Sequence, residues 1–69
     1  MTFVYHVIGD PRTGTPADVG KVMNILGKYG VNATTTTGSY DIETDTEIGL
    51  DAMRQIIDSW QGVELRKGL

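Results

Sequence analysis

The sequence predicts an α+β domain with elements in the order β-α-β-β-α-β, and three observations lead to this prediction. Two strand-like runs, residues 31–37 and 40–45, lie on either side of a tight turn at Gly38-Ser39. A helical pattern of apolar residues flanks each run, and a short alternating pattern lies near each end of the chain. This order is the split βαβ, or ferredoxin-like, plan. It implies one domain over residues 1–69, with a four-stranded antiparallel sheet in the order 4-1-3-2 and two helices on one face.

Residues 2–8 are predicted to form a central strand. They divide into two alternating sets that are both largely apolar, which are Phe3, Tyr5 and Val7 on one side and Val4, His6 and Ile8 on the other. Such a pattern is typical of a strand that is covered to some degree on both faces. The alternation leaves open which set faces the helices. If Val4, His6 and Ile8 face outward, His6 could neighbour the acidic residues of the predicted hairpin, and an interaction surface would lie around His6.

The first helix is predicted to begin after the glycine- and proline-containing loop of residues 9–14. Thr15 is the predicted N-cap, Pro16 suits the first helical position, and Asp18 favours the positive end of the helix dipole. Gly30 is expected to end the helix. The apolar stripe at helical spacing consists of Val19, Val22, Met23, Ile25, Leu26 and Tyr29.

The hairpin after the first helix is predicted to turn on the two-residue loop Gly38-Ser39. Glycine at the first position of such a loop suits a type II′ turn. The resulting pairs on the helix-facing side are Thr37 with Tyr40, Thr35 with Ile42 and Ala33 with Thr44. Those on the opposite side are Thr36 with Asp41, Thr34 with Glu43 and Asn32 with Asp45.

The second helix is predicted to begin at an N-cap formed by Asp45 or Thr46 and to stop at Gly62. Its predicted inner stripe consists of Leu50, Met53, Ile57 and Trp60, with Ala52 and Ile56 beside it. A charged edge strand follows, in which Val63 and Leu65 alternate with Glu64 and Arg66. The expected core is made of Val22, Leu26, Leu50, Met53 and Ile57.

The composition of the chain limits the classes of function that it can have. The chain has 69 residues, a net charge of −3 and no cysteine, so neither a disulfide nor a thiolate zinc site is available. The acidic balance argues against nucleic acid or an anionic membrane as a partner. Apolar runs are far shorter than the roughly 20 residues that span a bilayer, and the N-terminus lacks the basic start of a signal peptide. We therefore expect a cytoplasmic protein with no cofactor and no metal.

Few residues are candidates for chemistry. His6 is the single histidine, and a lone imidazole on a central strand is more often structural than catalytic. Asp41, Glu43 and Asp45 are expected to point the same way along one strand, as a solvated face or as an electrostatic docking face. Their spacing of nearly 7 Å is too wide for one metal ion without other ligands.

The loop of residues 9–14 resembles a phosphate-binding loop only in placing glycine before a helix. It lacks the G-x-x-x-x-G-K-[ST] pattern, so Arg12 is either an exposed turn residue or a neutraliser of an anion at the helix N-terminus. No Ser-His-Asp arrangement or nucleophile elbow is visible. We therefore predict that the protein is not an enzyme.

The chain also resembles ACT-type regulatory domains. The resemblance rests on Gly9-Asp10-Pro11-Arg12-Thr13-Gly14, on the helix through Val22, Leu26 and Tyr29, and on Gly30-Val31-Asn32. It departs from the ACT pattern in the extra residues before Gly14, in the Thr15-Pro16 that follows, and in the absence of a catalytic domain within these 69 residues. The resemblance implies a dimeric amino-acid sensor with Arg12, Gly14 and Asn32 near the ligand.

Two functions are therefore expected. The first is a non-catalytic interaction module that modulates a larger partner protein, in the manner of a small phage or mobile-element protein acting on a host target. It would bind that partner, or a second copy as a homodimer, through the open sheet face. We expect this surface to comprise Phe3, Tyr5, Val7, Asp41 and Glu43. The second is the ACT-like sensor.

Overall fold

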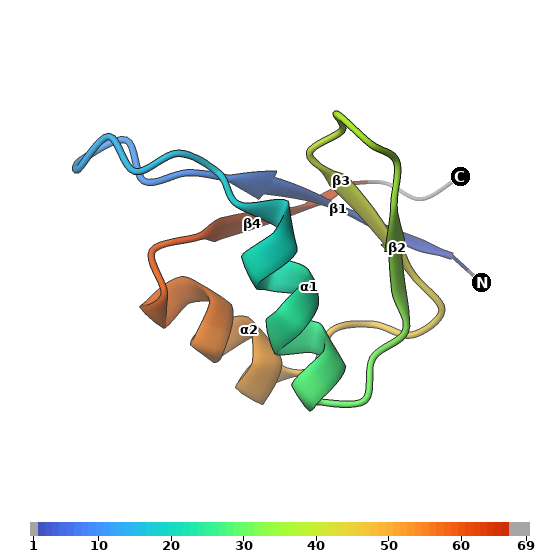
Figure 1. The fold of residues 1–69 in the computed structure, drawn as a ribbon. Helices are drawn as coiled ribbons and strands as arrows, with labels where there is room; N and C mark the ends of the chain where they lie inside the picture. The colour runs from blue at the N-terminus through green and yellow to red at the C-terminus, as the bar shows by residue number, and fades with distance from the viewer. Residues whose placement is uncertain (1, 67–69) are drawn as a thin grey trace.

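Strand β1 is the centre of the sheet in the computed structural model, which describes residues 2–66. Residue 1 and residues 67–69 of the predicted domain lie outside the described part. The elements are β1 (Phe3–Ile8), α1 (Val19–Lys28), β2 (Ala33–Thr35), β3 (Asp41–Thr44), α2 (Leu50–Asp58) and β4 (Gly62–Arg66). All strand pairs are antiparallel, and the order β2-β3-β1-β4 is the predicted 4-1-3-2 read from the other edge. Both helices lie on one side of the sheet (Figure 1).

The hairpin has the predicted register but a different turn. Ala33 pairs with Thr44, Thr34 with Glu43 and Thr35 with Ile42, as expected. The ladder stops there, because the Ser39 amide donates to the Thr36 carbonyl at 2.9 Å. This bond places Thr37 and Gly38 at the centre of the turn, with the positive φ of 82° on the second central residue. A type II′ turn needs it on the first, so the predicted turn at Gly38-Ser39 is wrong.

The Tyr40 carbonyl instead accepts a hydrogen bond of 2.8 Å from the Val7 amide of β1. The predicted pair of Thr37 with Tyr40 is therefore not part of the β2–β3 ladder.

Helix α1 begins later than predicted because the residues before it pair elsewhere. The Thr15 carbonyl accepts a hydrogen bond from the Asp10 amide at 2.9 Å, so Thr15 is not the N-cap. Asp18 takes that role, and its carboxylate accepts from the Lys21 amide at 3.0 Å. The buried face of the helix contains Val22, Ile25 and Leu26, which confirms the predicted core positions on this helix.

Helix α2 is rotated relative to the prediction. It begins at Leu50, after Gly49, and neither Asp45 nor Thr46 caps it. The row that enters the core is Ile48, Ala52 and Ile56. Of the predicted inner stripe, Met53 is half-buried, whereas Leu50, Ile57 and Trp60 are 85%, 58% and 53% exposed. The predicted core positions Leu50 and Ile57 are therefore wrong.

One of the two alternating sets of β1 side chains faces the helices. Tyr5 and Val7 are buried beneath the helices, and Phe3 is half-buried against the same core. The Tyr5 hydroxyl accepts a buried hydrogen bond of 2.9 Å from the Ile48 amide, just before α2. The expectation that Phe3, Tyr5 and Val7 form an open interaction surface is therefore wrong, and Val4, His6 and Ile8 occupy the other face.

Both helices end in the same hydrogen-bond pattern, with a different residue at the critical position. In α1, Gly30 has φ of 73° and Val31 donates back to Leu26. In α2, Trp60 occupies the equivalent position with φ of 65°, and Gln61 donates back to Ile56. Glycine is usual at this left-handed position, so a tryptophan there is uncommon.

Gly62 was predicted to end the second helix, but it is the first residue of β4. A Cβ at this position would overlap the Ile8 side chain, so close strand packing explains the glycine. Within residues 2–66, no helix has the length and apolar character needed to cross a membrane.

The rotation of α2 predicts different costs for two adjacent isoleucines. Ile56→Ala removes a fully buried side chain and should lower the free energy of unfolding by about 2–5 kcal/mol. Ile57→Ala makes the same change in helix propensity at an exposed position and should cost about 1 kcal/mol or less. Urea denaturation followed by circular dichroism measures both. Equal losses would contradict the observed orientation of the helix.

Candidate functional site: the open face of the sheet

No helix covers the outer face of the sheet, and strand pairing brings charged residues together there (Figure 1). His6 on β1 lies between Asp41 of β3 and Glu64 of β4. Val4 on the same strand lies between Glu43 and Arg66. The predicted carboxylates Asp41 and Glu43 are therefore on the open face, but beside His6 and Val4 rather than beside Phe3, Tyr5 and Val7.

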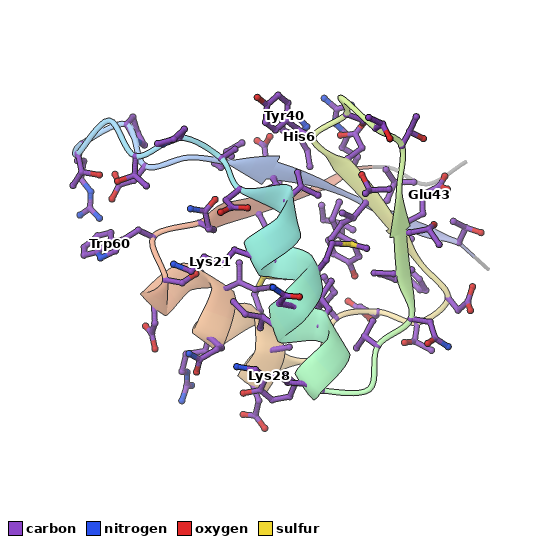
Figure 2. All side chains as sticks on the ribbon, in the orientation of Figure 1. His6, Lys21, Lys28, Tyr40, Glu43 and Trp60 are labelled. Atoms are coloured by element: carbon purple, nitrogen blue, oxygen red, sulfur yellow. The ribbon has the colours of Figure 1, made fainter. Side chains whose placement is uncertain are left out.

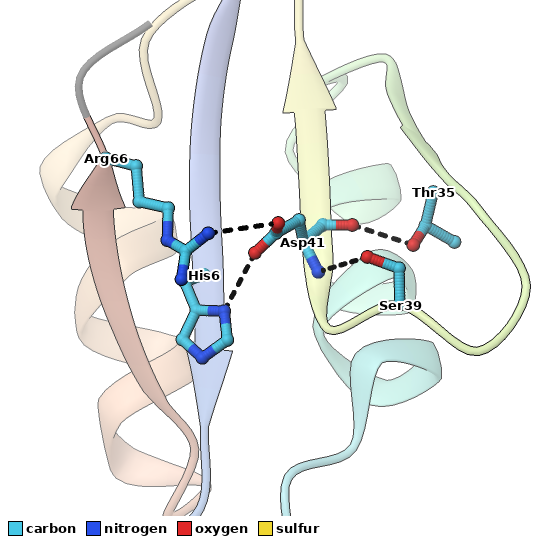
Figure 3. A network of polar contacts seen from close by, with 5 residues as sticks. All are labelled: His6, Thr35, Ser39, Asp41 and Arg66. Carbon is cyan, nitrogen blue, oxygen red and sulfur yellow. Dashed lines mark hydrogen bonds and ion pairs between the residues drawn. The ribbon is translucent and has the colours of Figure 1, made fainter.

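Asp41 is the centre of a network that involves residues of β1, β2, β3 and β4 (Figure 3). Its Oδ1 accepts a hydrogen bond of 2.8 Å from Nδ1 of His6, because an ionised carboxylate only accepts. Its Oδ2 accepts from Nη1 of Arg66 at 3.3 Å. The backbone of Asp41 is also held, since its amide donates to Ser39 Oγ and its carbonyl accepts from Thr35 Oγ1. Two side chains thus hold the carboxylate of Asp41, and two more hold its backbone.

A groove of about 520 Å³ lies beside this network. Its lining includes Val4, Asp41 and Arg66, the exposed Glu43, and the hydroxyl side chains of the β2–β3 hairpin. Glu43 has no ion-pair partner among the described residues. Asp45, the third predicted carboxylate, lies beyond the end of β3 and does not line the groove. The lining of the groove is therefore mostly polar, with Val4 as an apolar contact and Asp41, Glu43 and Arg66 as charged groups.

His6 and Asp41 have the geometry of an oriented imidazole, but no hydroxyl or amine of residues 2–66 hydrogen-bonds to His6. Within the same range, no three His, Cys, Asp or Glu side chains are placed to hold a metal ion. What the residues supply is a fixed pattern of charge across three strands.

A second polar cluster closes the loop between β1 and α1. Asp10 is buried, and its carboxylate accepts from the amide, Nε and Nη2 of Arg12 at 2.9, 3.3 and 3.3 Å. The guanidinium of Arg12 also lies over the Trp60 ring, 4.9 Å from its centroid. The hydrogen bonds of the Arg12 side chain, and then that of its amide, lower the pKa of Asp10 below 3.8, although burial opposes this.

The three residues implied by the ACT resemblance do not meet within one chain. Arg12 and Gly14 lie in the loop before α1, while Asn32 follows the far end of that helix (Figure 1). The Arg12 side chain is directed to Asp10 and Trp60. Asp18 caps the N-terminus of α1, which is the predicted position for an anion neutralised by Arg12. Gly14 has φ of 73°, and its amide donates to the Asp10 carbonyl.

Several residues of these clusters were not predicted as site residues. His6 and Arg66 join Asp41 because β1 lies between β3 and β4 and turns His6 to the open face, and the alternation of β1 left that orientation open. Asp10 carries a local signal, because an aspartate followed by proline and a loop favours a carboxylate bond to the amide two residues on. Gln61 is buried and carries no such signal. Its Oε1 accepts from the Asp18 amide at 2.7 Å.

Comparison with protein-family models, with curated proteins and with solved structures finds no match to this chain.

The Asp10–Arg12 contact predicts a measurable titration. In the native protein the Asp10 carboxyl should titrate below 3.8, and Arg12→Met should move its pKa upward. The Arg12 amide still donates in that variant, so part of the depression remains. Because the folded-state pKa is lowered, the contribution of Asp10 to stability is complete above about 3.8 and is lost as the pH falls through the folded-state value.

Carbon-detected NMR of the Asp10 carboxyl measures this titration, and Arg66→Met is the control. That variant removes an arginine from the Asp41 network and leaves the Asp10 loop unchanged. An Asp10 pKa that is the same in the native protein and in Arg12→Met would contradict the assignment.

Proposed function

We propose that this protein is a small non-catalytic interaction module that modulates a larger partner protein by docking it on the open sheet face. The observation that carries the proposal is the uncovered groove of about 520 Å³ beside the Asp41 network. Its side chains are already held by strand pairing and hydrogen bonds, so binding requires little further ordering. A cytoplasmic location is part of the proposal.

The charge of the face indicates the chemistry of the partner. Asp41, Glu43 and Glu64 outnumber Arg66, the one arginine or lysine of this face among residues 2–66. Asp41 is already engaged, whereas Glu43 on the rim of the groove is exposed. A partner segment carrying Lys or Arg beside an apolar residue would pair with Glu43 and cover Val4. Complementary charge of this kind favours the correct partner and opposes acidic ones.

A random peptide library panned against the immobilised protein tests the proposal. Selected peptides should be enriched in Lys and Arg, and Glu43→Lys should weaken their binding by about tenfold or more. The matched control is Glu47→Lys, which makes the same change at an exposed position outside the groove and should leave binding nearly unchanged. Peptides without basic enrichment, or equal binding to Glu43→Lys, would contradict the proposal.

The alternative function is an amino-acid sensor. Thermal denaturation of the protein in the presence of each free amino acid in turn distinguishes it from the interaction module. A sensor gains RT ln(1 + [L]/Kd) of stability from its ligand. The proposed module should show no such gain. An amino acid that raises the melting temperature of the native protein, but not that of Arg12→Ala, would favour the sensor.

A further inference from the structure

The exposed side of α2 carries an apolar stripe that its own domain does not cover. Leu50, Met53 and Ile57 are three and four residues apart, so they share one helix face. Together with Arg54 they line a surface hollow of about 240 Å³. Leu50 and Ile57 are largely exposed. Trp60, just beyond the helix end, is also exposed (Figure 2), and together with Ile57 it lines a neighbouring hollow. Neighbouring apolar side chains of this kind mark an interaction surface, whereas scattered ones do not.

Charged residues follow this stripe in a self-complementary pattern. Asp51, Arg54 and Asp58 are also three and four residues apart, and they form the row next to the stripe on its solvent side. The single cation lies between two anions. Within residues 2–66, none of the three forms an ion pair with another side chain. Their charges are therefore available to another molecule.

We propose that a second copy of this chain covers the stripe, with the two α2 helices packed antiparallel about a two-fold axis near residue 54. In this arrangement Leu50 of one copy lies against Ile57 of the other, and the two Met53 side chains meet at the centre. The two-fold axis keeps the charged rows on the same side of the helix pair, so Arg54 of each copy lies between Asp51 and Asp58 of its partner. An isologous interface needs this self-complementarity.

Trp60 contributes to the same surface at the end of the helix. The Arg12 guanidinium holds its ring from one side, and Asp10 holds Arg12. Tryptophan and arginine are enriched among the residues that carry most of the energy of protein interfaces. This support keeps the ring in position at a main-chain conformation that is unfavourable for a large residue.

The dimer is independent of the proposed partner site, because α2 and the open sheet face lie on opposite sides of the molecule (Figure 1). A dimer through α2 would leave two outward sheet faces free. A single helix pair buries less than the roughly 800 Å² per partner of a standard interface, so we expect a dissociation constant in the micromolar range or weaker.

Sedimentation equilibrium tests the self-association. The native protein should dimerise with increasing concentration, and Leu50→Asp should be monomeric with an unchanged circular dichroism spectrum. The control is Tyr40→Asp, which places the same charge at an exposed aromatic residue on the hairpin, far from α2 (Figure 2). It should dimerise like the native protein. A native protein that is monomeric at millimolar concentration, or Leu50→Asp associating as tightly as the native protein, would overturn the proposal.

A charge exchange between two proteins tests the antiparallel arrangement itself. Arg54→Glu and the double variant D51K/D58K should each lose self-association, with dissociation constants raised by about tenfold or more. Mixed together, the two variants should form a heterodimer. In it, the side chain of residue 54 in each copy meets opposite charges at positions 51 and 58 of the other copy. This outcome remains decisive if Leu50→Asp fails to fold. Two variants that stay monomeric in the mixture would overturn the arrangement.

Failure of the dimer and failure of the proposed function are distinguishable. Leu50→Asp should still bind the selected peptides, and Glu43→Lys should still dimerise. Loss of dimerisation in Glu43→Lys would place the contact between copies on the sheet face and overturn the α2 interface.

Discussion

The buried hydrogen bond between the Tyr5 hydroxyl and the Ile48 amide fixes how the second half of the chain lies on the first. It joins the central strand to the segment that leads into α2. Ile48 is held in the core before the helix begins, and Ala52 and Ile56, which are four residues apart on α2, also face inward. Leu50 and Ile57 are then directed to solvent. The contact made by β1 and the exposed stripe on α2 thus belong to one orientation of the helix.

The sequence was sufficient for much of the hairpin register, which depends on local patterns, and the order of the sheet followed from the ferredoxin-like plan that the element order indicates. The period-two alternation and the turn residues determine which of Thr34 and Thr35 faces outward. The position of the turn itself differed by one residue, since the carbonyl of Tyr40 pairs with β1. That pairing is tertiary and leaves no mark in the hairpin's own sequence.

The orientation of α2 and of β1 could not be predicted for one shared reason. Each element carries two apolar sets, so periodicity alone offers two equivalent solutions. On α2 the row of Ala52 and Ile56 is no more apolar than that of Leu50 and Ile57. On β1, Tyr5 and Val4 belong to rival sets of similar character. The carboxylates of the candidate site were found because Asp41 and Glu43 lie on a strand with one polar set, whereas the place of His6 depended on which face of β1 points outward.

At position 60, the residue that favours stability differs from the one that favours association. Glycine would relieve the left-handed backbone there, as Gly30 does at the end of α1, and an engineer seeking a higher melting temperature would choose it first. That change would also remove the single tryptophan of the chain and the ring under Arg12. A library sorted for thermal stability alone should therefore discard this aromatic residue, while one sorted for association should retain it.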